Sequence, residues 1–173
     1  VMIDLSSIAK GYTVDKVAEV LVANEVSRFY VEIGGEIRVQ GKRPEKKLWR
    51  IGIQQPSTLN GKIVPFRIIT LTDASIATSG DYRQFFKHNG RLYSHVIDPK
   101  TGMPVQGVAS VTVVAPECAI ADGLATALMV MGPEEGLSLI ESMSDVEGLI
   151  VERIGPEEYK DYMTSGFAKL ILR

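Results

Sequence analysis

Residues 29–39 of the chain read FYVEIGGEIRV. Aromatic and β-branched residues from Phe29 to Ile33 favour a strand, and the pair Gly34-Gly35 favours a turn. The pattern resumes from Ile37 to Val39, which favours a second strand. This segment therefore predicts two strands joined by a tight turn.

The rest of the chain repeats this strand-rich pattern. An Asn89-Gly90 pair is a strong hairpin signal, and Pro56–Gly61 reads as a polar loop. Apolar or alternating runs predict further strands at Trp49–Ile53, Phe66–Leu71, Tyr82–Phe86, Leu92–Ile97, Ser110–Ala115, Leu149–Arg153 and Ala168–Leu172.

Three segments have helical character instead. Apolar residues recur at helical spacing in residues 13–26, and an Ala-, Leu- and Met-rich pattern runs from Cys118 to Met131 before Gly132-Pro133. A further helix is expected at Glu134–Met143. Because the strands outnumber the helices and mostly follow one another as hairpins, we expect an α+β fold with a mainly antiparallel sheet and packed helices, forming one domain over residues 1–173.

Composition excludes several classes of function. The chain has 173 residues, 45% of them hydrophobic, and a net charge of −2, so it has no basic field for a nucleic acid. A single cysteine, Cys118, excludes an internal disulfide and a cysteine-built metal site. No apolar run approaches the roughly 18 residues of a membrane span.

Two early segments could hold a phosphate. Residues 4–12 read DLSSIAKGY, in which Lys10 can neutralise a phosphate; the alternative is a helix start capped by Ser6 or Ser7. After the first strand, Gly34, Gly35 and Glu36 can seat a pyrophosphate or a sugar, or can simply make a turn.

Two later segments combine hydroxyls, charges and a histidine. Residues 77–83 read ATSGDYR, and a loop containing Thr78, Ser79, Gly80 and Asp81 could hold phosphate oxygens or could be an ordinary turn. In YSHVIDPKTG, residues 93–102, His95 is either a general base or ligand contact, or a structural strand residue.

The segment ADGLATA at residues 121–127 contains the strongest metal signal. Asp122 and Thr126 stand four residues apart and therefore share a helix face among apolar neighbours. A buried carboxylate needs a partner, which could be the helix N-terminus or a hard cation. Carboxylate and hydroxyl oxygens are ligands suited to Mg²⁺.

Together these five segments, in this order, resemble the ApbE family of FAD:protein FMN transferases, with a T-fold-like architecture expected. The resemblance covers residues 4 to about 132 and includes Val14-Asp15 after the first motif. The family usually has Asp where this chain has Glu36. Family members also carry a substantial segment before the first motif, which we expect to be missing here.

The resemblance implies the chemistry and the roles of the residues. Mg²⁺ would be held by Asp122, Thr126 and the carbonyl of Ser7. FAD, the substrate, would contact Lys10 and His95 as well as the glycine and hydroxyl segments; His95 or Asp81 would take the acceptor proton. A Ser or Thr of a partner protein would receive FMN through a phosphoester, releasing AMP. The alternatives are hydrolysis of FAD to FMN and AMP, or flavin binding without catalysis.

The resemblance also implies partners and a location. Acceptors would be flavoprotein subunits of bacterial membrane redox complexes, with no nucleic acid involved. The family is typically exported, so we expect a periplasmic protein or one at the outer face of the inner membrane. Membrane attachment would come only through a lipid anchor in the missing N-terminal segment.

Overall fold

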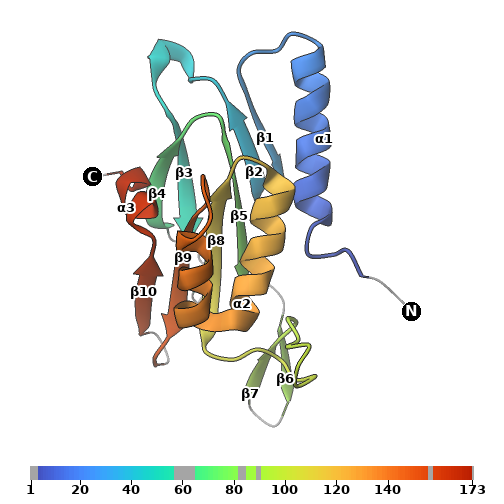
Figure 1. Cartoon of the computed structure of the whole chain (residues 1–173), viewed down its shortest axis with the longest axis vertical. Helices are drawn as coiled ribbons and strands as arrows, with labels where there is room; N and C mark the ends of the chain where they lie inside the picture. The colour runs from blue at the N-terminus through green and yellow to red at the C-terminus, as the bar shows by residue number, and fades with distance from the viewer. Residues whose placement is uncertain (1–3, 57–64, 82–84, 89–90, 156–157, 173) are drawn as a thin grey trace.

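The fold is built on one antiparallel sheet. The computed structural model describes residues 4–56, 65–81, 85–88, 91–155 and 158–172. Six strands form the main sheet in the order β1-β2-β5-β8-β9-β10, and every neighbouring pair is antiparallel (Figure 1). Their bounds are β1 Phe29–Ile33, β2 Glu36–Gln40, β5 Ala74–Gly80, β8 Val108–Ala115, β9 Glu147–Arg153 and β10 Tyr159–Met163.

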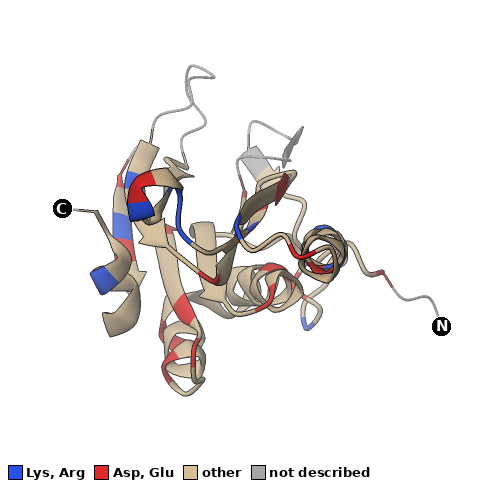
Figure 2. Cartoon of the chain, turned by 90° about the horizontal axis from the view of Figure 1, so that it is seen from above, with Lys and Arg blue, Asp and Glu red and all other residues tan. Residues whose placement is uncertain are grey.

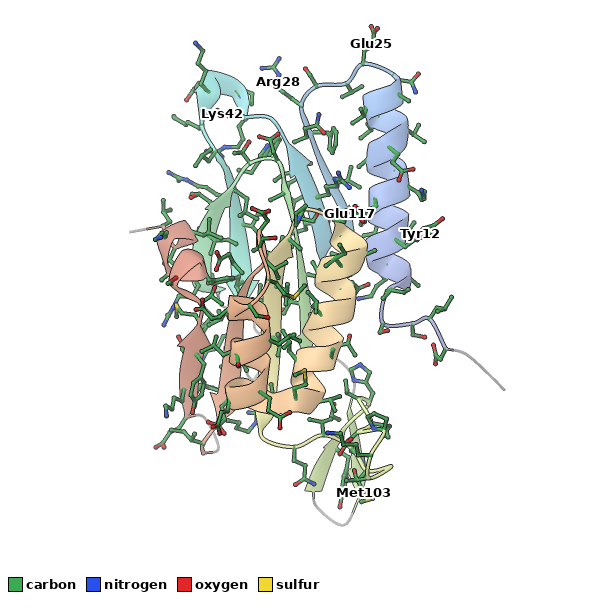
Figure 3. The ribbon with its side chains drawn as sticks, viewed as in Figure 1. Tyr12, Glu25, Arg28, Lys42, Met103 and Glu117 are labelled. Carbon is green, nitrogen blue, oxygen red and sulfur yellow. The ribbon has the colours of Figure 1, made fainter. Side chains whose placement is uncertain are left out.

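Two helices cover one face of this sheet. The helix α1 spans Ala9–Ala23, and α2 spans Cys118–Glu141 with a break at Gly132, whose φ is 78°. Figure 3 labels Tyr12 near the start of α1, Glu25 beyond its end and Glu117 at the start of α2, so the two helices run in opposite directions. The core on this face joins α2 to the inward side chains of β5, β8 and β9.

A hairpin and a short helix cover the opposite face. The strands β3, Trp49–Gln54, and β4, Pro65–Leu71, pair with each other, and α3 spans Ser165–Leu170. Their apolar residues pack with Ile37, Val39 and Ile76 of the main sheet. Because side chains alternate along β2, Glu36 and Arg38 point toward the helices instead.

A second hairpin lies beside these layers. It pairs β6, Phe85–His88, with β7, Arg91–Ser94, and Figure 1 shows it below the middle of α2, where this helix is broken. The predicted pairing of these strands is confirmed. The predicted turn at Asn89-Gly90 and most of the predicted Pro56–Gly61 loop lie outside the described residues.

The predicted α+β class is confirmed, and most predicted strands are found within two or three residues of their expected ends. Two predictions are wrong. Residues 77–80 are not a loop but part of β5, a central strand whose polar residues find partners in its neighbours. Residues 168–172 are not a strand, because α3 occupies most of them, capped by the Thr164 side chain; strand β10 was not predicted.

The described helices and surface add two observations. None of the helices in the described ranges is long and apolar enough to cross a membrane. Acidic and basic residues are interspersed over the visible elements rather than gathered in one basic field (Figure 2).

Candidate active site

The first and fifth motifs meet where α1 crosses α2. The backbone N–H of Gly11 donates to Oδ2 of Asp122 at 2.9 Å. Gly11 is buried, and a Cβ at this position would lie 2.4 Å from the Cys118 carbonyl oxygen. Only a glycine allows this approach, so the contact depends on the sequence of both segments.

Asp122 is a buried carboxylate with few hydrogen bonds to stabilise its charge. The residue is 3% exposed, and among the described residues no donor binds its second carboxylate oxygen. Burial raises the pKa of Asp122, while the Gly11 N–H and the positive charge of Lys10 oppose that rise. The helix begins at Cys118, which puts Asp122 in the second turn, beyond the free N–H groups of the helix N-terminus that was one of its two predicted partners.

Thr126 lies one turn after Asp122, as the spacing predicts. Its Oγ1 is 3.1 Å from the hydroxyl of Ser79 on β5 and 3.4 Å from the Asp122 carbonyl oxygen. Ser7 is half-buried and precedes Ile8, whose side chain lies against Gly123 of α2. The segment that contains Ser7 therefore borders the Asp122 turn, and the metal role of its carbonyl stays a prediction.

This donor set fits a hard cation. Nowhere in the described ranges do three or more His, Cys, Asp or Glu side chains gather as a metal site of those ligands alone. The predicted site is of another kind, with one carboxylate, one hydroxyl and one carbonyl oxygen, the ligands that Mg²⁺ accepts while keeping waters and substrate phosphates. A bound cation would also supply a positive counter-charge for the buried carboxylate of Asp122.

Lys10 is held beside this site by Glu36. Lys10 Nζ donates to Glu36 Oε1 at 2.6 Å, and the Glu36 side chain is 1% exposed. The Lys10 side chain is 45% exposed, so its charge remains accessible to a ligand. Gly34, at a φ of 65°, passes next to the Lys10 stem. Glu36 therefore lies behind Lys10 and orients it, and a direct cofactor contact by Glu36 stays a prediction.

The sheet separates the other predicted cofactor-binding residues. Ser79 faces α2, whereas Thr78 bonds to Thr112 at 2.9 Å and lines a cavity of about 230 Å³ between the sheet and β3. Gly35 and Arg50 line the same cavity. Gly80 is buried at the end of β5. The tight loop predicted for this motif is therefore replaced by a strand with two faces.

Asp81 is engaged by a basic residue that the sequence analysis did not identify. Its two oxygens lie 3.0 and 3.2 Å from Arg153 Nη2. Burial raises the pKa of Asp81, and the charge and hydrogen bonds of Arg153 oppose the rise without cancelling it. Tyr82 and Arg83 of the same motif lie outside the described residues.

His95 follows the end of β7 instead of lying on a strand. Its side chain is exposed, between the buried Ser94 and Val96. Its predicted catalytic and cofactor-binding roles stay predictions.

Asp15 belongs to the first motif, but its structural role could not be assigned from the sequence. It is 6% exposed on α1, accepts hydrogen bonds from the backbone N–H groups of Cys118 and Ala119 at 3.0 and 2.8 Å, and pairs with Arg38 at 2.5 Å. A charged residue among apolar ones on the buried side of a helix was the available signal.

Comparisons with known proteins agree with this arrangement. Residues 1–150 match the ApbE family. A Vibrio cholerae protein named FAD:protein FMN transferase is 45% identical over 166 residues, or 95% of this chain and 48% of that protein. A Haemophilus influenzae protein of the same name is 47% identical over 152 residues, 87% of this chain and 44% of that protein.

Solved structures give the same result. The apo flavinyl transferase ApbE of Pseudomonas stutzeri superposes with a TM-score of 0.81 at 40% identity, covering 98% of this chain and 51% of that one. The ApbE protein of Thermotoga maritima superposes with a TM-score of 0.85 at 32% identity, covering 99% and 54%. The chain therefore spans about half the length of the relatives that it matches.

Proposed function

The chain belongs to the ApbE family, and we propose that it forms the metal- and phosphate-binding part of a FAD:protein FMN transferase. The names of its relatives support this activity. The single observation that carries the proposal is the contact of Asp122 with Gly11, because it brings the predicted metal ligands next to the predicted phosphate-binding lysine.

In the proposed reaction, the hydroxyl oxygen of a Ser or Thr on an acceptor protein attacks the phosphorus on the FMN side of FAD. A new phosphoester bond forms, the bond from that phosphorus to the bridging oxygen breaks, and AMP leaves with the electron pair. The hydroxyl proton passes to a base. Mg²⁺ bound by Asp122, Thr126 and the Ser7 carbonyl would offset the negative charge on the phosphoryl oxygens and the leaving group.

Other residues of this chain would bind the phosphate and take the proton. Lys10, oriented by Glu36, binds a pyrophosphate oxygen and adds a second positive charge. His95 lies at the surface, where an acceptor protein would approach, so it is the better candidate for the base. The Asp81 carboxylate already faces Arg153, which favours a supporting role for this residue.

Partner and location are part of the proposal. The acceptor would be a flavoprotein subunit of a bacterial membrane redox complex, and the protein would be exported and anchored through a lipid. The bacterial sources of the relatives are compatible with such a setting.

The test combines the full-length protein with FAD, Mg²⁺ and an acceptor protein. We expect flavin fluorescence on the acceptor band of a denaturing gel, together with one AMP per transferred FMN. Asp122→Ala should abolish both signals. Asp161→Ala should retain them, because Asp161 pairs with Arg67 on the far side of the sheet.

Other outcomes would identify another function. FMN and AMP formed without labelled acceptor would indicate a FAD pyrophosphatase. FAD binding without AMP release would indicate a flavin-binding domain and would contradict the proposed transfer.

A further inference from the structure

The helix that carries Asp122 begins without a cap of its own. Its N-cap residue, Glu117, makes no side-chain hydrogen bond, and the first turn contains no acidic residue. The first N–H groups of a helix have no partner within the helix. Here two of them, from Cys118 and Ala119, are bound by the carboxylate of Asp15, more than 100 residues earlier in the chain.

Asp15 is itself held in place from the sheet. Arg38 Nη1 lies 2.5 Å from Asp15 Oδ1, and the Arg38 side chain is 27% exposed. Two residues before Arg38 on the same face of β2, Glu36 holds Lys10. Two ion pairs of opposite polarity thus fix α1 on β2, one at Lys10 and one at Asp15.

The contacts between the helices are reciprocal. The Asp15 carboxylate of α1 binds backbone N–H groups of α2, and the Asp122 carboxylate of α2 binds the backbone N–H of Gly11 on α1. Gly11 lies one turn before Asp15, and Cys118 lies one turn before Asp122. The four residues therefore form a closed arrangement that sets both the spacing and the rotation of the two helices at the candidate metal site.

We infer that Asp15 is a positioning residue for the metal site: by capping α2 from α1, it places Asp122 and Thr126 relative to the segment of Ser7 and Lys10. The inference rests on the proposed function. Asp15 is not proposed as a metal ligand, because both of its oxygens are occupied by α2 and Arg38. Loss of a group that is hydrogen-bonded to a metal ligand typically lowers metal affinity about 10- to 100-fold. Asp15 acts one step further out, by placing the Gly11 N–H that binds Asp122.

The experiment compares Asp15→Ala and Asp15→Asn with wild type and with Thr164→Ala. Thr164 caps α3, which lies on the other face of the sheet, by accepting a hydrogen bond from the Phe167 N–H at 3.2 Å. Thr164→Ala is therefore a matched control, because it also removes a helix cap. The first readout is the affinity for Mg²⁺ alone, by calorimetry. The second is the hydrogen-exchange rate of the Gly11 amide, by NMR, with each variant studied equally far below its melting temperature.

For Asp15→Ala we expect the affinity for Mg²⁺ to fall about tenfold or more. We expect hydrogen exchange at the Gly11 amide to accelerate by about the same factor. Asp15→Asn, which keeps one acceptor oxygen, should recover part of both losses and remains informative if the alanine variant does not fold. Thr164→Ala should change neither. Wild-type affinity and wild-type Gly11 exchange in Asp15→Ala would overturn the inference, as would equal losses in Thr164→Ala.

The two proposals can fail separately. If wild type binds no Mg²⁺, the metal assignment is wrong, and the Gly11 exchange rate alone decides the role of Asp15. Unchanged exchange then overturns the inference. Accelerated exchange confined to Gly11 and the first turn of α2 supports Asp15 as the residue that positions Asp122.

Discussion

The side chain of Asp122 is hydrogen-bonded to the backbone nitrogen of Gly11, 2.9 Å away and 111 residues earlier in the chain. At that position a Cβ would lie 2.8 Å from the Asp122 Cβ and 2.7 Å from the Cys118 carbonyl carbon. The two helices are therefore as close as a glycine allows, and the candidate metal site depends on that closeness.

Gly11→Ala should force α1 and α2 apart, because the atoms it would meet are mainly backbone and cannot move independently. We expect a loss of about 1–3 kcal/mol in the free energy of unfolding, typical of overpacking, measured by urea denaturation. Mg²⁺ affinity should fall as well. Gly52→Ala is the control, since its Cβ would meet nothing within 4 Å. Equal stability of the two variants would contradict the close contact.

Asp122→Asn should abolish stabilisation by Mg²⁺ without unfolding the protein, because the amide keeps the shape of the side chain and a possible acceptor for Gly11. Wild type at 100 times its dissociation constant for Mg²⁺ should gain about 2.7 kcal/mol, measured as a rise in melting temperature. Asp161→Asn is the control, because the carboxylate that it removes pairs with Arg67 on the other face of the sheet. Mg²⁺ should stabilise this variant as much as wild type. A full Mg²⁺ response in Asp122→Asn would exclude Asp122 as a ligand.

The raised pKa of Asp122 gives stability a defined pH dependence. The stabilising contribution of its protonated form is fully present below the ordinary carboxyl pKa of 3.8 and is lost as pH rises through the folded-state value. Without Mg²⁺, the free energy of unfolding of wild type should therefore fall relative to that of Asp122→Asn as pH rises from 3.8 to the folded-state pKa. Above that pKa the difference between the two proteins should stay constant. Urea denaturation at a series of pH values measures it. A difference that moves in favour of wild type with rising pH would mean a lowered pKa.

Local sequence predicts most of this sheet because alternation and turn residues are local signals. The FYVEIGGEIRV segment becomes β1 and β2 as expected. The ATSGDYR segment misleads for a physical reason: Thr78 and Ser79 look like loop residues, but Thr112 and Thr126 satisfy their hydroxyls in the fold. Partners from distant strands and helices are not visible within a window of seven residues.

The same limit applies to the site. The spacing of Asp122 and Thr126 correctly predicts a shared helix face, because four residues make about one helical turn. The partner of Asp122 was expected to be its own helix end or a cation, but Gly11 also binds it. Asp15 was noticed only as part of a motif, since the N–H groups it caps lie more than 100 residues later.

Cys118 should be unreactive in the folded protein. It is fully buried at the start of α2, and burial, together with the charges of Asp15, Asp122 and Glu36, raises the pKa of the thiol to about 12. A thiol reacts as its thiolate, so at pH 8 a disulfide reagent should label Cys118 only as fast as the protein opens. Labelling in urea supplies the full extent of reaction. Rapid labelling of native protein would show that the α1–α2 contact opens readily.

The last prediction separates the two roles of Lys10, as a phosphate ligand and as a partner of Glu36. Lys10→Met removes a charge 2.6 Å from a carboxylate that is 1% exposed, so the free energy of unfolding should fall by roughly 1–3 kcal/mol, toward the low end because the lysine is half-exposed to screening solvent.

The double variant Lys10→Met/Glu36→Gln should recover much of that stability, because no buried charge then loses its counter-charge. It should not recover ligand binding. In the full-length protein, both variants should bind FAD more weakly than wild type while binding riboflavin equally well, because only FAD carries phosphate; fluorescence titration measures both ligands. Restored FAD affinity in the double variant, or equal losses for FAD and riboflavin, would make Lys10 a purely structural partner of Glu36.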